Sequence, residues 1–239
     1  MPNPFKALLL SAGLGTRLRP ITFHTPKCLV PIGGEPLLGR WLRKLELAGC
    51  SSVLVNTHYM AAQVEAFIKD WQKKSKMTVQ TIYEPELLGT AGTLLANQGF
   101  FNGGTGLLIH ADNAMAGDLK EFLAAHHKRQ YCCELTMLTF RTNTPSSCGI
   151  VEIDDKQVVQ AFHEKLVEPP GNRANGALYA FEQDFLDSLR LMKPKPSDFS
   201  TEVIPKFLGR IQSWHTKQEY LDIGTPESLN LAQQLLRDK

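Results

Sequence analysis

Residues 5–27 read FKALLLSAGLGTRLRPITFHTPK, and this stretch decides how the chain folds. Its apolar start, Phe5–Leu10, predicts a short buried strand. The two glycines that follow let the backbone turn sharply and point its N–H groups at an anion. Arg17 places a planar guanidinium inside this turn, and Lys27 adds a second cation just beyond it. The combination predicts a polyphosphate site, and therefore chemistry on a nucleotide.

Other phosphate-binding loops do not match this stretch. A dinucleotide-binding fingerprint needs a third glycine where Leu18 stands, and an acidic residue at the end of the second strand, where Asn56 stands instead. A P-loop needs Gly-Lys-Ser/Thr at the close of the turn, and the turn has no such triplet. A purely structural turn would explain the glycines but not the two cations.

The bulk properties are those of an enzyme that handles small molecules. The 26 basic and 24 acidic side chains nearly balance, and no basic run predicts a partner nucleic acid. No apolar run approaches the roughly 20 residues that span a bilayer, so we expect no membrane partner. The cysteines are odd in number and lack Cys-x-x-Cys spacing, which predicts reduced thiols and a cytoplasmic location. They are Cys28, Cys50, Cys132, Cys133 and Cys148.

Strand-like and helix-like segments alternate along the first part of the chain, as in a wound α/β sheet. Expected strands there are 5–10, 52–56, 77–83, 106–111 and 132–140, and expected helices are 37–48, 61–71, 92–97 and 119–128. After residue 142 we expect strands 149–153, 158–163 and 174–181, helices 185–192 and 201–208, a strand pair 211–214 and 219–223, and a closing helix 226–236. The pattern predicts one domain over 1–239, with a nucleotide half (1–140) and a half for a second substrate (141–239).

Residues 12–34 and 36–37 resemble the signature of the nucleoside-triphosphate:sugar-1-phosphate nucleotidyltransferases, also called nucleotide-sugar pyrophosphorylases. Further motifs follow in that family's order: Leu88-Gly89-Thr90-Ala91-Gly92, Asp112-Asn113, Gly149-Ile150-Val151, Glu164-Lys165, Asn175-Gly176-Ala177-Leu178-Tyr179 and Asp222-Ile223-Gly224-Thr225-Pro226. The chain is most similar to short members that act as mannose-1-phosphate or heptose-1-phosphate guanylyltransferases. The resemblance implies a Rossmann-like three-layer α/β/α fold with a mixed, mostly parallel central sheet.

The reaction implied is attack of a sugar 1-phosphate oxygen on the α-phosphorus of a nucleoside triphosphate, which expels pyrophosphate. Family precedent makes Arg17, Lys27 and Asp112 catalytic, and assigns Asp112 and Asp222 to a bound Mg²⁺. From sequence alone, an aspartate at a strand end is more often a cap or turn residue than a metal ligand. The family usually has glycine where Ala111 stands, and we interpret the neighbouring His110 as a packed strand residue.

The resemblance also implies the substrate-binding residues. For the nucleotide they are Ala12, Gly13, Gly15, Thr16, Glu84, Gly89 and Thr90, and for the sugar phosphate they are Gly149, Glu164, Lys165 and Asn175. A glutamate accepts hydrogen bonds only, which modestly favours guanine, with two adjacent N–H donors, over uracil. Asp198 and Thr201 are expected to cap a helix, although Thr201 with Glu202 would alternatively border the sugar. Three extra residues, 166–168, separate the Glu-Lys pair from the proline that usually follows it.

We therefore predict transfer of a nucleotidyl group, with GTP and a mannose- or heptose-type 1-phosphate as substrates, in nucleotide-sugar and polysaccharide biosynthesis. Alternatives are a uridylyltransferase for a glucose-, N-acetylhexosamine- or muramic-type 1-phosphate, and a non-catalytic protein that binds the same ligands. A nicotinamide-dependent oxidoreductase is disfavoured by Leu18 and by the neutral end of the second strand. The sequence leaves the oligomeric state open and does not exclude a homo-oligomer.

Overall fold

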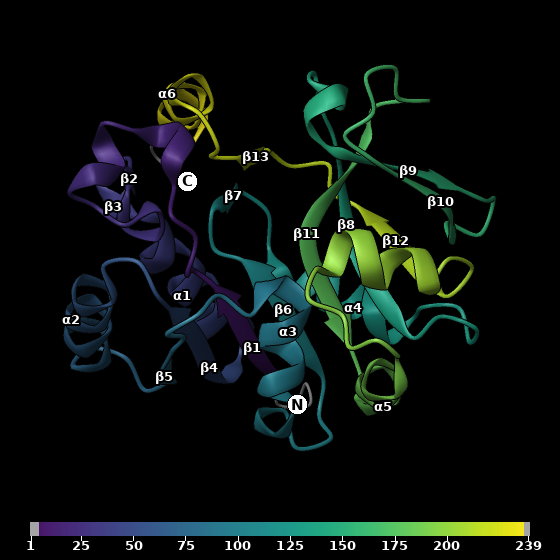
Figure 1. Cartoon of the computed structure of the whole chain (residues 1–239), viewed down its shortest axis with the longest axis horizontal. Helices are drawn as coiled ribbons and strands as arrows, with labels where there is room; N and C mark the ends of the chain where they lie inside the picture. Colours follow the sequence, from purple (N-terminus) through teal and green to yellow (C-terminus); the bar gives the residue numbers. More distant parts are fainter. Residues whose placement is uncertain (1–4, 237–239) are drawn as a thin grey trace. The chain divides into compact units, whose positions relative to one another are not determined.

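The computed structural model describes residues 5–236, which form two compact units (Figure 1). The first unit contains the chain up to Leu87, then Ile109–Leu119, and finally the residues from Gln218 onward. The second unit contains Leu88–Leu108 and Lys120–Lys217. The first unit is therefore discontinuous in sequence, because the chain leaves it after Leu87, comes back to it briefly, and returns to it at Gln218.

Parallel strands form the centre of the first unit. β1 (Phe5–Leu10) pairs with β4 (Cys50–Thr57), and β4 pairs with β5 (Thr78–Tyr83), both in parallel. Within the same unit, the N–H of Ala111, just beyond the end of β6 (Gly106–His110), donates to the Leu10 carbonyl at the end of β1 at 3.0 Å. Because parallel strands end at the same edge of a sheet, the segments that follow these strands gather there. The predicted phosphate-binding turn is one of them.

Two helices connect these strands. α1 (Leu37–Ala48) has apolar residues at helical spacing, and it ends at Gly49, which takes the left-handed conformation with φ of 88°. α2 (Ala61–Gln72) contacts β5, while α1 contacts β4. The helices and strands that the sequence predicted in this unit begin and end within two residues of the predicted bounds, whereas its three short strands at 31–32, 35–36 and 113–115 were not predicted.

The first unit also contains two short antiparallel pairs. β2 (Pro31–Ile32) and β3 (Glu35–Pro36) form a hairpin directly after the phosphate-binding turn. β7 (Asn113–Met115) pairs with β13 (Tyr220–Asp222), so Asp222 lies opposite Asn113. The last helix, α6 (Pro226–Leu235), lies beside the β2–β3 hairpin, where yellow meets purple in Figure 1.

The second unit is built on a mixed sheet. β8 (Leu135–Arg141), β9 (Gly149–Ile153), β10 (Val159–Glu164) and β11 (Arg173–Phe181) pair in antiparallel fashion, whereas β12 (Ile211–His215) runs parallel to β8. The helices outside the first unit are α3 (Gly89–Ala96), α4 (Leu119–His127), which begins at the boundary of the units, and α5 (Gln183–Leu191). No helix within residues 5–236 combines the length and the apolar character needed to cross a membrane.

Two sequence predictions are wrong. The strands expected at 211–214 and 219–223 do not pair with each other, since β12 pairs with β8 and β13 pairs with β7. The helix expected over 201–208 is a π-helical turn, η6 (Phe199–Val203), followed by a 3₁₀ turn, η7 (Ile204–Lys206). Pro205 has no N–H to continue an α-helical ladder, which is why the apolar spacing misled the prediction.

Candidate functional site

The turn after β1 is closed by contacts that require a glycine at position 15. Gly15 has φ of +64°, and a Cβ on it would lie 2.9 Å from Thr22 Cγ2 and 3.1 Å from Lys27 Cβ. The Thr22 hydroxyl donates to the Gly15 carbonyl at 2.8 Å. The turn therefore packs directly against the aliphatic stem of Lys27, and this packing places the lysine.

Gly15→Ala is expected to destabilise the protein by about 1–2 kcal/mol, because alanine is strained at positive φ and its methyl group presses on Thr22. Thermal or urea unfolding measures the effect. Gly13→Ala is the matched control, since a Cβ on Gly13 has nothing within 4 Å, and it should change stability by less than about 0.5 kcal/mol. Equal effects from both substitutions would contradict this account of the turn.

Lys27 joins the two aspartates that the sequence separates by 110 positions. Its Nζ lies 2.6 Å from Asp112 Oδ2 and 3.9 Å from Asp222 Oδ1, and its side chain is only 10% exposed. Asp112 directly follows the β6–Ala111 segment, and Asp222 is the last residue of β13. The N–H of Ile223 donates to the Asp112 carbonyl at 3.1 Å, which holds the two chain segments together.

The pKa values of the two carboxylates are shifted in opposite directions. Burial alone would raise the pKa of Asp112, but the Lys27 ammonium and, more weakly, His110 outweigh it and hold that pKa below its usual value. Burial and the nearby Asp112 charge raise the pKa of Asp222. One carboxylate is thus neutralised by its lysine, while the other carries a charge that the protein alone does not fully compensate.

Arg17 is exposed on the same unit, close to the segment that follows Asp222. A Cβ on Gly224 would lie 3.0–3.1 Å from three atoms of the Arg17 guanidinium. Gly224 therefore lets the chain pass against the guanidinium, a role that the sequence analysis missed. Its only signal was a glycine two residues after an aspartate at a strand end.

A buried polar chain supports the start of the turn. Asn56 Oδ1 accepts from the Ser11 N–H at 2.7 Å, and Asn56 Nδ2 donates to Glu84 Oε1 at 3.1 Å. Glu84 is 3% exposed, so its carboxylate lies beneath the turn rather than on the surface. Its role in reading the base stays a prediction. Asn56 was missed, although a polar residue at the end of a buried strand next to β1 was the available signal.

The remaining nucleotide candidates of the first unit lie on the turn itself. Ala12 is buried, and Gly13 and Thr16 are exposed. Next to Lys27, burial raises the pKa of the Cys28 thiol to about 12, so this cysteine stays protonated and is no nucleophile at neutral pH.

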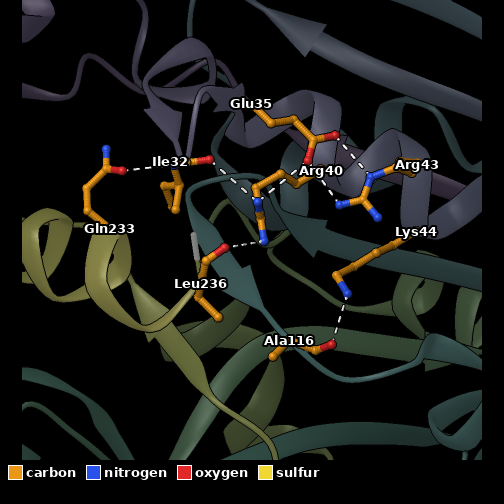
Figure 2. Close-up of polar contacts among 9 residues, drawn as sticks. Ile32, Glu35, Arg40, Arg43, Lys44, Ala116, Gln233 and Leu236 are labelled. Atoms are coloured by element: carbon orange, nitrogen blue, oxygen red, sulfur yellow. Dashed lines mark hydrogen bonds and ion pairs between the residues drawn. The ribbon is translucent and has the colours of Figure 1, made fainter. Parts of the chain in front are cut away.

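Helix α1 holds the strand that follows Asp112. Trp41 Nε1 donates to the Asn113 carbonyl at 2.7 Å. Lys44 Nζ donates to the carbonyls of Ala116 at 3.2 Å and Gly117 at 3.0 Å, and Figure 2 shows the first of these bonds. Burial, reinforced by the neighbouring Arg43 and Arg40 charges, lowers the pKa of Lys44 to about 8. The backbone beyond Asp112 is therefore fixed from the helix side.

The donor set at Asp112 and Asp222 suits a hard divalent cation. Among residues 5–236, no group of three or more His, Cys, Asp or Glu side chains is placed to hold a metal ion. Mg²⁺ commonly binds through one or two carboxylates and takes its other ligands from substrate phosphates and water. Burial and the Asp112 charge raise the pKa of Asp222, and a cation bound between the two carboxylates would favour the charged form of both.

In the second unit, the predicted sugar-phosphate residues come from neighbouring strands. Gly149 of β9 pairs with Glu164 of β10, and a Cβ on Gly149 would lie 2.8 Å from Glu164 Oε2. Lys165 Nζ lies 3.1 Å from Glu164 Oε1, and the lysine side chain is 64% exposed. Asn175 of β11 donates to the buried Tyr179 hydroxyl at 2.7 Å. The exposed ammonium of Lys165 is the group that remains open to a phosphate.

Gly89 and Thr90, at the start of α3, interlock with residues 197–199. The N–H of Ala91 donates to the Ser197 carbonyl at 2.9 Å, and Thr90 Oγ1 accepts from the Phe199 N–H at 2.7 Å. Asp198 accepts from the Thr201 N–H at 2.8 Å, so its predicted capping role is confirmed. Glu202 accepts from the Ser197 N–H at 2.7 Å. Through these contacts, Asp198 and Glu202 stabilise the loop and turn around residues 197–201 within the second unit.

Comparison with known proteins finds relatives that match most of the chain. The chain is 30% identical over 225 residues to mannose-1-phosphate guanylyltransferase of Mycobacterium tuberculosis, covering 92% of this chain and 61% of that protein. It is 31% identical over 235 residues to the catalytic subunit beta of mannose-1-phosphate guanylyltransferase of Drosophila melanogaster, covering 94% and 61%. The chain thus spans about three fifths of the length of these relatives.

Solved structures share the fold. A protein from Bacillus anthracis, provisionally named a glucose-1-phosphate thymidylyltransferase and crystallised with sucrose, superposes with a TM-score of 0.87 at 22% identity, covering 98% of this chain and 96% of its own. HddC from Yersinia pseudotuberculosis superposes with a TM-score of 0.77 at 25% identity, covering 96% and 98%. The predicted α/β fold with a mixed sheet is confirmed by these structures.

The model of the nucleotidyl transferase family matches residues 6–239, which includes every candidate residue described above. By this match, this chain belongs to the nucleotidyl transferase family.

Proposed function

We propose that this protein transfers a nucleotidyl group from a nucleoside triphosphate to a sugar 1-phosphate, and releases pyrophosphate. The observation that carries the proposal is the cluster of Arg17, Lys27, Asp112 and Asp222 beside a glycine turn. Two cations suit phosphate oxygens, and two carboxylates suit a metal that bridges them. A protein that only bound the nucleotide would have no evident use for a carboxylate pair held this close to a lysine.

This reaction depends on the neutralisation of negative charge more than on covalent catalysis. A phosphate oxygen must attack a phosphorus that already carries negative charge, so repulsion is the main barrier. Positioned cations lower such a barrier because they are fixed before the reaction begins. Lys27, held by its stem against the turn and by Asp112, is suited to bridge the reacting phosphates. Arg17 is exposed, and its planar guanidinium is suited to hold the departing pyrophosphate.

We propose Mg²⁺ as the metal, with Asp112 and Asp222 as its protein ligands. When bound, it would neutralise phosphate charge and orient the oxygens for in-line displacement. In this arrangement Asp112 has two functions, since its other contact keeps Lys27 in place. Asp222 supplies the second carboxylate, whose pKa is raised by burial and by the nearby Asp112 charge, so a bound cation would stabilise its ionised form.

For the substrates, we propose GTP and a mannose-type 1-phosphate, with a heptose-type phosphate as the nearest variant. The names of the relatives at 30–31% identity support this choice. Glu84, predicted from the sequence to read the base, is buried and accepts from Asn56 Nδ2, so the choice of guanine rests on the names of these relatives. In the second unit, we assign the sugar phosphate to Glu164, Lys165, Gly149 and Asn175, with Lys165 as the phosphate-binding cation.

The product would be a nucleotide sugar, which points to polysaccharide or glycoconjugate synthesis. We propose a cytoplasmic location, for which the five cysteines argue, because they are odd in number and lack Cys-x-x-Cys spacing.

A matrix of substrates tests the proposal. GTP, UTP, CTP, ATP and dTTP are each combined with mannose, glucose, N-acetylhexosamine, muramic and heptose 1-phosphates in the presence of Mg²⁺, and pyrophosphate release is measured. We expect GTP with mannose 1-phosphate to give the highest kcat/KM, and chelation of the metal to stop release. If kcat/KM is highest with UTP, GTP is not the preferred nucleotide and the proposed substrates are wrong. If no pair of substrates releases pyrophosphate, the proposed activity is wrong.

A further inference from the structure

The C-terminal end of α6 is tied to the β2–β3 hairpin by a side-chain amide. Gln233 Oε1 accepts from the Gly33 N–H at 2.8 Å, and Gln233 Nε2 donates to the Pro31 carbonyl at 2.7 Å. One glutamine thus satisfies two backbone groups of the hairpin, as a neighbouring strand would. Both bonds are directional, so they fix where along the hairpin the helix sits.

Arg40 of α1 makes a second connection to the same helix end. Its Nη2 donates to the Leu236 carbonyl at 3.2 Å, and its Nη1 lies 3.5 Å from both the Ile32 carbonyl and Glu35 Oε2 (Figure 2). Arg40 is only 4% exposed, and a buried charge is costly unless its partners are well placed. A cation at the carbonyl end of a helix is also favoured by the helix dipole. The hairpin, α1 and α6 therefore meet at this guanidinium.

Glu35 completes this connection. Its carboxylate forms a two-point contact with Arg43, at 3.1 and 3.0 Å, and faces Arg40 as well (Figure 2). Because Glu35 belongs to β3, the hairpin is held by α1 on one side and by Gln233 on the other. We call Arg40 and Gln233, with the hairpin groups that they contact, the α6 clamp.

The other end of α6 begins directly after the candidate site. Thr225 and Ser228 form a reciprocal cap, with the Ser228 N–H 3.3 Å from Thr225 Oγ1 and the Thr225 N–H 3.0 Å from Ser228 Oγ. Gly224, against Arg17, is the residue before this cap, and Asp222 lies two positions earlier. A helix of ten residues is about 15 Å long and stiff, so a shift at its clamped end also moves its capped end.

Apolar packing holds α6 in place but does not set its position along its axis. Leu229, Ala232 and Leu236 share a buried cluster with Ile223 and with Leu18 of the phosphate-binding turn. Burial of apolar surface is strong but has no directional preference. The clamp supplies the directional contacts that the cluster lacks.

We propose that Arg40 and Gln233 are positioning residues, which fix α6 on the β2–β3 hairpin and thereby hold Asp222 at Lys27 and Gly224 at Arg17. The part of this inference that concerns the metal rests on the proposed function of Asp222. The mechanical part, that the clamp orders residues 218–225, stands independently of it.

Gln233→Ala tests the proposal, with Gln234→Ala as the matched control, because Gln234 is exposed on the same helix. The first readout is amide hydrogen exchange of residues 218–225. The second is binding of Mn²⁺ alone to the full chain, followed by electron paramagnetic resonance. We expect Gln233→Ala to speed exchange in this segment and to weaken Mn²⁺ binding about tenfold, as loss of a residue that orients a metal ligand does. Gln234→Ala should leave both unchanged.

A purely structural role would lower the melting temperature of Gln233→Ala and leave Mn²⁺ binding unchanged, and that result would overturn the proposal. Arg40→Met and Arg40→Lys extend the test: both lose the fork of donors, and Mn²⁺ binding should weaken in whichever variant folds. If the wild-type protein shows no nucleotidyl transfer, the proposed function is wrong. The hydrogen-exchange measurement still tests the α6 clamp in that case. If the wild-type protein transfers nucleotidyl groups but Gln233→Ala does not change hydrogen exchange of residues 218–225, the α6 clamp is refuted and the proposed function stands.

Discussion

Asp112→Asn should lower the rate of pyrophosphate release by about 10³-fold while the protein stays folded. The amide keeps the shape of the carboxylate but loses its charge, so its oxygen would bind a metal, and the Lys27 ammonium 2.6 Å away, much more weakly. Loss of a single group that stabilises charge in a transition state costs about 10²–10³ in rate, and Asp112 holds Lys27 as well. Steady-state pyrophosphate release with GTP and mannose 1-phosphate measures the rate, and circular dichroism confirms the fold. Normal turnover in this variant would refute the assignment of Asp112.

Asp222→Asn provides the matched comparison, because it makes the same chemical change on the other carboxylate. Turnover should fall in both variants, but stability should move in opposite directions. The pKa of Asp112 is lowered in the folded protein, so its charge stabilises the fold, and the asparagine variant should lose roughly 1 kcal/mol. The pKa of Asp222 is raised, so its charge opposes folding, and Asp222→Asn should melt at a higher temperature than wild type in the absence of metal. Equal stability losses would contradict the electrostatic description of the pair.

Much of this architecture follows from local pattern. The apolar run of β1, the glycine that ends α1 and the alternation of residues 77–83 are short-range signals, and the structure places β1, α1 and β5 within one residue of the predicted bounds. The cations of the turn were also recognisable, because a strand, two glycines and an arginine occur within 13 residues of one another.

The parts that the sequence could not determine depend on contacts between distant residues. β13 has three residues, too few for a pattern to say whether it joins β12 or β7. That choice decides that Asp222 lies in the first unit, close to Lys27 and Asp112. The resemblance to a family predicted that Asp112 and Asp222 share one site. Their positions in the sequence alone favoured two separate helix caps or turn residues.

The buried polar residues beneath the site were missed for a similar reason. Asn56 and Arg40 are polar residues that local rules place at a strand end and on a helix face, with no indication of a partner. Their partners, Ser11 and Leu236, lie 45 and 196 positions away. Only the folded chain shows that such residues connect the site to its supports.

Lys27→Ala should reduce turnover by about 10²–10³-fold and should also change how stability depends on pH. The lysine is the main favourable partner of Asp112, and in wild type it keeps the pKa of that carboxyl below its usual value. The stability that Asp112 contributes is therefore present above the unfolded pKa of about 3.9 and is lost as pH falls through the lower, folded pKa. Without Lys27 this contribution is absent at every pH.

The difference in unfolding free energy between wild type and Lys27→Ala should consequently be largest near pH 7, at about 1–2 kcal/mol for a partly exposed pair, and should close as the carboxyl protonates in acid. Urea unfolding at a series of pH values measures it. Arg17→Ala is the control, because Arg17 influences Asp222 only weakly and is exposed: its turnover should fall similarly, with a stability difference that is small and flat with pH. If the difference in unfolding free energy between wild type and Lys27→Ala instead grows as the pH falls, the lysine does not hold Asp112 in its charged form. The cluster would then lack the internal ion pair that places a cation and a carboxylate side by side before any substrate binds.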